Sequence, residues 1–162
     1  VVCRRQRQMC IRDRLRSGKK GFLVHESDLS PNFLNGYDMI LIQGNPLKST
    51  SRSSLVQSFI SDALKEYQKK CTENQKCDVS LINLEDSKMI KRLMDEKGLS
   101  SLSSNYPAIG AVNDQIQKLR NESIIVDYQY QKWDKSFWPH SSKGFFKLKS
   151  KIPKILKQLD CM

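Results

Sequence analysis

The sequence contains no long hydrophobic run. No stretch of about 18 consecutive apolar residues occurs among its 162 residues, so we expect no transmembrane helix. Glycine and proline are scarce, with 7 and 5 residues, which excludes a collagen-like or linker-dominated chain. Hydrophobic residues still make up 38% of the chain and charged residues 28%, a composition that can bury a core. The length indicates about one domain.

Cysteine and histidine are too few and too poorly spaced to indicate a metal site or a disulfide framework. The chain has five cysteines. Only Cys71 and Cys77 lie in its central part, and their spacing matches no zinc-binding pattern. His25 and His140 are the only histidines. We therefore expect free thiols, no metal ion and a cytoplasmic protein.

The signature motifs of several enzyme classes are also missing. The chain has no Gly-x-Ser-x-Gly elbow of an α/β-hydrolase and no Walker-type phosphate loop. It also lacks the Gly-x-Gly-x-x-Gly signature of a dinucleotide-binding domain. No catalytic residue is assigned from the sequence.

The positive charge is concentrated at the N-terminus. The formal net charge is +11, but residues 1–20 hold eight basic residues and one acidic residue, which leaves a net +4 for the rest. Residues 1–20 have no apolar periodicity and begin with Val1, so we interpret them as a non-native leader, such as translated adapter read-through. A phosphate-contacting basic arm and an Arg-rich transit peptide are the alternatives. We do not expect nucleic acid as a partner.

Hydrophobic periodicity predicts alternating strands and helices. Strands are expected where short apolar runs are bounded by turn residues, and helices where apolar residues recur at spacings of three and four. The predicted strands are 38–43, 79–82 and 123–128. The predicted helices begin near 55, 86 and 109, and the first has one inward stripe at Leu55, Val56, Phe59, Ile60, Ala63, Leu64 and Tyr67. Residues 21–36, 99–106 and 128–138 are expected to be irregular, and 145–159 a basic amphipathic segment.

This order predicts an α/β fold with a doubly wound parallel sheet. Strands that alternate with helices pair in parallel, and the crossover helices cover the faces of the sheet. Three strands are few for such a layer, so we interpret residues 37–162 as a partial domain that is incomplete at its C-terminus. The expected strand order begins 2-1-3.

The turn after the first predicted strand has the composition of an anion site. Gly44-Asn45-Pro46 is followed by a Ser-rich stretch that contains Thr50, Ser51 and Arg52, and then by a helix. The N–H groups at a helix N-terminus favour an anion, and hydroxyl and guanidinium groups add donors for a phosphate. An ordinary Ser-rich capped turn is the alternative.

Aromatic residues gather after the third predicted strand. They are Tyr128, Tyr130, Trp133, Phe137 and Trp138, followed by Pro139. A planar heteroaromatic ligand can stack on such residues, although core packing also explains them. In a doubly wound sheet, ligands bind at the carboxyl ends of strands where the strand order reverses. The 2-1-3 order would bring this aromatic loop opposite the Ser-rich turn.

Three segments resemble a known family. They are Ile40-Leu-Ile-Gln-Gly-Asn-Pro46 with Thr50-Ser51-Arg52, then Val79-Ser-Leu-Ile-Asn-Leu-Glu85, and then Pro139-His-Ser-Ser-Lys-Gly-Phe145. In order and spacing they resemble the flavodoxin-like family of NAD(P)H:quinone oxidoreductases and NADPH-dependent flavin reductases. In place of that family's Pro-aromatic-Trp run, this chain has Gln129-Tyr130-Gln131-Lys132-Trp133.

The resemblance implies a flavin-dependent oxidoreductase. A nicotinamide, NADH or NADPH, would pass hydride to bound FMN or FAD, which would reduce a quinone or similar small electron acceptor. Asn45, Thr50, Ser51 and Arg52 would hold the flavin phosphate, and Tyr130, Trp133 and Pro139 would flank its ring. A homodimer is also implied. The alternatives are a non-catalytic basic α/β binding module, with its Lys-rich tail at 143–157, and a divergent relative that has lost flavin.

Overall fold

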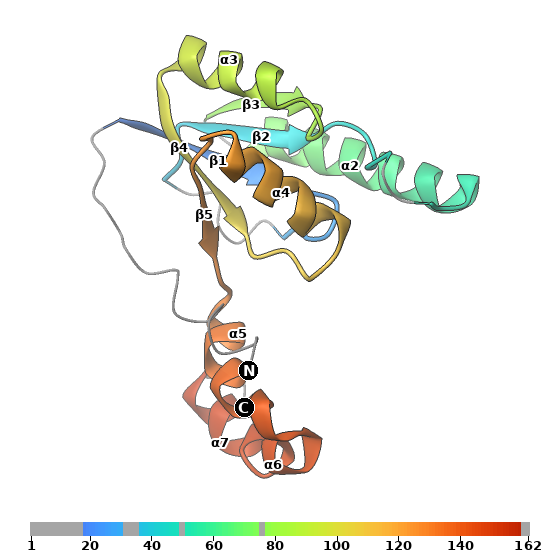
Figure 1. Cartoon of the computed structure of the whole chain (residues 1–162). Coiled ribbons are helices and arrows are strands. Elements are labelled where there is room, and N and C mark those ends of the chain that lie inside the picture. The colour runs from blue at the N-terminus through green and yellow to red at the C-terminus, as the bar shows by residue number, and fades with distance from the viewer. Residues whose placement is uncertain (1–17, 31–35, 49–50, 75–76, 160–162) are drawn as a thin grey trace. The chain divides into compact units, whose positions relative to one another are not determined.

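The computed structural model describes residues 18–30, 36–48, 51–74 and 77–159. The chain divides into two compact units, Val1–Tyr128 and Gln129–Met162 (Figure 1). The first unit contains nearly all of the sheet and three long helices, and the second contains only short helices. Each unit is described by itself below.

The core element is a five-stranded parallel β-sheet with the order β3-β2-β1-β4-β5. Its strands are β1 (Lys19–Val24), β2 (Met39–Gln43), β3 (Asp78–Ile82), β4 (Leu99–Asn105) and β5 (Val126–Gln129). In register, Phe22 of β1 lies opposite Ile40 of β2 and Ser103 of β4. All five residues of β2 are buried, which fits its continuous apolar sequence.

The predicted fold class, a doubly wound parallel α/β sheet, is confirmed, and the sheet is consistent with the flavodoxin-like type. The three predicted strands are β2, β3 and β5, and they keep their predicted relative order. The prediction that the first and third would be neighbours is wrong, because β1 and β4 lie between β2 and β5. The point where the strand order reverses therefore lies between β1 and β4.

The prediction that residues 21–36 are irregular is wrong at their start. Residues 19–24 form β1, the central strand, which pairs with both β2 and β4. Lys19 and Lys20, placed in the leader by the sequence analysis, are the first residues of this strand. The backbone of Lys20 also exchanges hydrogen bonds with Asp38. Residues 1–17 lie outside the described part of the chain.

The Ser-rich segment 99–106 was predicted to be a loop, and this prediction is also wrong. Residues 99–105 form β4. Two of its serines donate hydrogen bonds to β1: the buried Ser104 donates from Oγ to the Leu23 carbonyl at 2.9 Å, and the half-buried Ser100 donates from Oγ to the Lys19 carbonyl at 3.1 Å. These bonds join β4 to β1 and offset the cost of burying hydroxyl groups.

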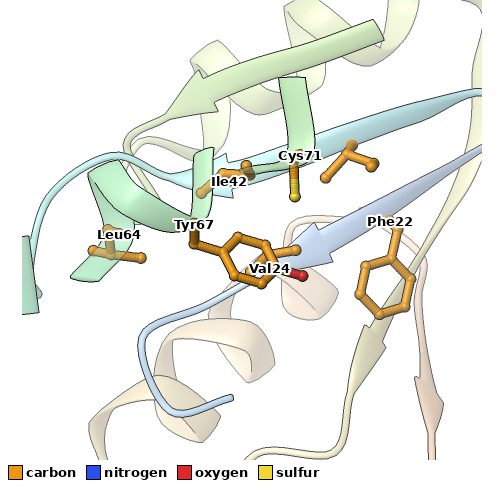
Figure 2. Close-up of a cluster of buried hydrophobic side chains, with 7 residues drawn as sticks. Phe22, Val24, Ile42, Leu64, Tyr67 and Cys71 are labelled. Carbon is orange, nitrogen blue, oxygen red and sulfur yellow. The ribbon is translucent and has the colours of Figure 1, made fainter. Parts of the chain in front are cut away.

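One face of the sheet is covered by α2 (Ser54–Asn74). Figure 2 shows Leu64, Tyr67 and Cys71 of this helix against the even-numbered side chains of the strands. The buried cluster consists of Phe22, Val24, Ile40, Ile42, Leu64, Tyr67 and Cys71. Alternation along a strand places neighbouring side chains on opposite faces, so this cluster occupies one face of β1 and β2.

The other face is covered by α3 (Ser87–Lys97) and α4 (Ala111–Asn121). The chain reverses direction across the sheet after β3, and right-handed crossovers then place the following helices on the opposite face. Figure 1 shows α4 in front of the strands and α2 behind them. The inward residues are fully or nearly buried: Leu23, Met39, Leu41, Ile90, Met94, Val112, Ile116 and Leu119.

The predicted start of α3 near residue 86 is confirmed by its N-cap. The Asp86 carboxylate accepts a hydrogen bond from the Met89 amide at 2.9 Å, which is the N-cap interaction expected there. Gly98 closes the helix in the left-handed conformation at φ 68°, which a residue without a side chain adopts most readily.

The predicted inward stripe of α2 is only half correct. Leu64 and Tyr67 are buried, but Leu55 and Phe59 are 79% and 74% exposed. The C-terminal part of α2 packs on the strands, whereas its first turns expose their apolar side chains. Periodicity predicts the helix and its apolar side, but not where along its length the helix meets the sheet.

The second unit contains α5 (Lys132–Phe137), the 3-10 helix η2 (Trp138–Lys143), α6 (Phe145–Lys149) and α7 (Ile152–Gln158). The aromatic segment 128–138, predicted to be irregular, is thus largely helical. Ile155 of α7 is buried. Within the described ranges, no helix is long and apolar enough to cross a membrane.

Candidate functional site

Polar side chains meet where the central strands of the sheet end. The carboxyl ends of parallel strands lie at one edge of a sheet, and ligands of doubly wound folds bind outside that edge. Here β1 is followed by His25 and Glu26, β2 ends at Gln43, and β4 ends at Asn105. The loop from β2 to α2, residues 44–53, starts at this edge and contains the predicted phosphate-binding residues.

Glu26 is the best-connected residue of this edge. Its carboxylate Oε2 accepts hydrogen bonds from Gln43 Nε2 at 3.0 Å and from the Leu47 amide at 3.1 Å. Its Oε1 lies 2.7 Å from Arg52 Nη2 in an ion pair. The Glu26 side chain is only 2% exposed. Such burial costs several kcal/mol for a lone charge, so the ion pair and the two hydrogen bonds are what keep this carboxylate inside.

Gln43 connects the end of β2 to both neighbours. Its side chain is fully buried, and its Oε1 accepts a hydrogen bond from the Glu26 amide at 3.0 Å. Its Nε2 donates to the Asn45 carbonyl at 2.7 Å as well as to Glu26. The same side chain therefore fixes the first turn of the loop and the end of β1.

Arg52 lies at the far end of the loop, two residues before α2 begins. Its side chain is 25% exposed, and its Nη2 is held by Glu26. Its other terminal nitrogen, Nη1, is buried and has no hydrogen-bond partner within the described residues. Arg52 was predicted to bind phosphate, and its ion pair with Glu26 was not predicted.

The other predicted phosphate ligands are less constrained. Asn45 and Ser51 are exposed, and the Asn45 carbonyl is bound by Gln43. Ser53 Oγ accepts a 3.4 Å hydrogen bond from the Val56 amide, a weak cap for the start of α2. Thr50 lies outside the described residues.

The predicted ring-flanking residues belong to the second unit. The Tyr130 and Trp138 rings meet edge to face with centroids 5.2 Å apart. The Trp133 ring is 57% exposed and lies 6.4 Å from that of Phe137, measured between centroids. Pro139 is exposed in η2. These residues form an aromatic surface of their own unit, and a meeting with the 44–53 loop stays a prediction.

Sequence analysis did not single out the buried pair at the β1/β4 reversal point. His25 is fully buried, and its ring Nε2 lies 3.1 Å from the Asn105 carbonyl. A carbonyl only accepts, so Nε2 carries the proton and Nδ1 keeps its lone pair. His25 Nδ1 and the Asn105 side-chain oxygen have no hydrogen-bond partner among the described residues. The pairing of β1 with β4, which was not predicted, brings these two residues together.

Burial lowers the pKa of His25 below its ordinary value. The main cause is loss of water around the charged form of the ring. The Asn105 carbonyl and the carboxylates of Asp28 and Glu26 act in the opposite direction, but more weakly. His25 is therefore a neutral histidine at neutral pH.

The two described cysteines are unsuited to nucleophilic chemistry. Cys71 is buried in the core and Cys77 is half-buried, and both are free thiols. Burial raises the pKa of each thiol, so little thiolate is present near neutral pH. Within the described ranges, no group of three or more His, Cys, Asp or Glu side chains is arranged to hold a metal ion.

Comparison with known proteins does not identify a family for this chain. No protein-family model, no curated protein and no solved structure matches this chain. Function is therefore inferred from the residues of the chain itself.

Proposed function

We propose that this chain is an NAD(P)H-dependent flavin oxidoreductase that passes hydride through bound FMN or FAD to a quinone or similar small acceptor. One observation carries the proposal. The fully buried strand β2 leads through a polar loop into the N-terminus of the 21-residue helix α2, beside Arg52. A helix N-terminus presents N–H donors and a partial positive charge to a phosphate.

The residues of the loop fit a phosphate monoester. The Arg52 side chain is 25% exposed, so its guanidinium group can donate to an anion while Nη2 remains on Glu26. Asn45, Thr50 and Ser51 would contribute further donors from the same loop. When bound, the flavin supplies the redox chemistry, and the protein supplies orientation and shielding from water.

A purified sample tests the proposal directly. We expect the full chain to carry, or to take up, a chromophore with the visible absorption of flavin. Addition of NADH or NADPH without oxygen should bleach this absorption, and a quinone should restore it. A protein that stays colourless after incubation with FMN and with FAD would contradict the proposal. Gel filtration of the same sample tests the homodimer that the proposal includes.

The competing proposal is a basic binding module without catalysis. It is favoured by the second unit, where Lys147, Lys149, Lys151, Lys154 and Lys157 are all exposed on α6, α7 and the turn between them. A colourless protein whose affinity for polyanions falls steeply with added salt would favour this module over the oxidoreductase.

A further inference from the structure

Glu26 contacts the β2–α2 loop at both of its ends. Through Oε2 it binds the Leu47 amide, four residues after β2, and through Oε1 it pairs with Arg52, two residues before α2. Gln43 completes the connection, because its Nε2 bridges Glu26 Oε2 and the Asn45 carbonyl. A single side chain that follows β1 therefore contacts the loop after the neighbouring strand at two places, Leu47 and Arg52.

The carboxylate is the chemical form that these contacts require. Leu47 N–H, Gln43 Nε2 and Arg52 Nη2 are all donors, and an ionised carboxyl group is the side chain that only accepts. An amide in the same place would present its own NH₂ group to one of these donors. Gln43 cannot compensate by turning over, because its Oε1 already accepts from the Glu26 backbone amide.

The ion pair also anchors Arg52. Its Nη2 is held 2.7 Å from Glu26 Oε1, which fixes the guanidinium group, while 25% of the side chain remains exposed. An anchored guanidinium loses less conformational freedom when it binds an anion than a free one does. The ion pair therefore neutralises part of the positive charge of Arg52 and holds its guanidinium group in a fixed position.

We infer that Glu26 is a positioning residue for the phosphate loop: it orders the loop backbone at Leu47 and anchors the guanidinium group of Arg52 for the ligand, without touching the ligand itself. This inference rests on the proposed function for the identity of the ligand. The ordering of the loop is independent of that identity, and it can be measured without any ligand.

The first arm of the test uses the ligand-free full chain. Glu26→Gln should make the Leu47 amide exchange with solvent at least about tenfold faster, which corresponds to the loss of roughly one good hydrogen bond. The double variant Glu26→Gln with Arg52→Gln leaves no unpaired charge, so it should fold even if the single variant fails to fold. The Leu47 amide should exchange faster in the double variant than in the wild type. Unchanged Leu47 exchange in both variants would overturn the inference.

The second arm compares FMN with riboflavin, which has the same ring and no phosphate. Glu26→Gln should lower the affinity for FMN about tenfold and change the affinity for riboflavin by less than about twofold, because only the phosphate contacts depend on the loop. Equal weakening of both ligands would mean that Glu26 only supports the fold, and would overturn its positioning role. A wild-type chain that binds neither ligand would contradict the proposed function, while Leu47 exchange would still decide whether Glu26 orders the loop.

The chain offers a matched control in α2. Glu66 and Lys70 form an ion pair of the same length, 2.7 Å, but the Glu66 side chain is 66% exposed. Glu66→Gln makes the same chemical change in water, where such pairs contribute little. It should leave Leu47 exchange and both ligand affinities unchanged.

Discussion

Arg52 pairs with Glu26 inside the protein, and the proposed ligand would be its second partner. The sequence places it in a Ser-rich turn before a helix, and that context predicts anion binding. Nothing in the local sequence indicates that a carboxylate 26 positions earlier in the chain lies against it, because this contact depends on β1 pairing with β2. The same holds for His25 and Asn105, which are 80 positions apart.

Replacement of Arg52 should therefore lower the stability of the ligand-free protein as well as its affinity for the ligand. Arg52→Ala leaves the Glu26 carboxylate buried without its cation, which should lower the free energy of unfolding by about 3 kcal/mol. The double variant with Glu26→Gln should recover most of this loss, because no buried charge is then left unpaired. Urea unfolding of the two variants measures both values. Additive losses in the double variant would show that the pair is uncoupled.

His25 should make the protein less stable in mild acid. Its pKa is lowered in the folded state, so the unfolded chain binds a proton at a higher pH than the folded chain does. Its contribution to stability is complete above the unfolded value of about 6.5 and is lost as the pH falls below that value. The maximum slope is about 1.4 kcal/mol per pH unit.

Variants separate His25 from other titrating groups. Urea unfolding between neutral pH and mild acid should show a shallower decline of stability for His25→Gln than for the wild type. His140→Gln removes an exposed histidine and should leave the wild-type decline unchanged. Equal declines in all three proteins would show that His25 does not become protonated on unfolding.

Secondary-structure elements with a clear apolar period were predictable, and those without one were not. β2, α2 and α3 follow from their hydrophobic patterns and end residues. β4, with the sequence LSSLSSN, has the composition of a loop, and the hydroxyl group of Ser104 can be buried in this strand because the Leu23 carbonyl of β1 accepts its hydrogen bond. β1 begins with two exposed lysines, and its short apolar run gives too weak a signal to separate it from a loop.

The contact between α2 and the sheet gives a test at the scale of this element. Leu64 is buried against β1 and β2, so Leu64→Ala should lower the free energy of unfolding by about 2–5 kcal/mol. Phe59 is 74% exposed, so Phe59→Ala should change it by less than about 0.5 kcal/mol. Both side chains lie on the stripe that the sequence predicts to be inward. If urea unfolding showed similar losses of unfolding free energy for Leu64→Ala and Phe59→Ala, the whole stripe would face inward as predicted, and the observed packing would be contradicted.

For the whole molecule, the sequence predicted the fold class and the strand β2 that leads into the candidate phosphate loop, but not the centre of the sheet. Insertion of β1 and β4 between β2 and β5 moves the reversal point away from the predicted place. The two predicted halves of the flavin site also fall in different compact units. The phosphate half, with Asn45, Ser51 and Arg52, belongs to the unit that contains the sheet, and it carries the functional proposal.

A calorimetric titration of the full wild-type chain with FMN and with riboflavin tests the central claim most directly. If the β2–α2 loop binds a flavin phosphate, FMN should bind at least about tenfold more tightly than riboflavin, because one charge-assisted hydrogen bond from Arg52 contributes about 1.5–3 kcal/mol. Added inorganic phosphate should lower the apparent affinity for FMN and leave the affinity for riboflavin unchanged. Equal affinity for the two flavins, or binding of neither, would contradict the assignment of this loop as a phosphate site.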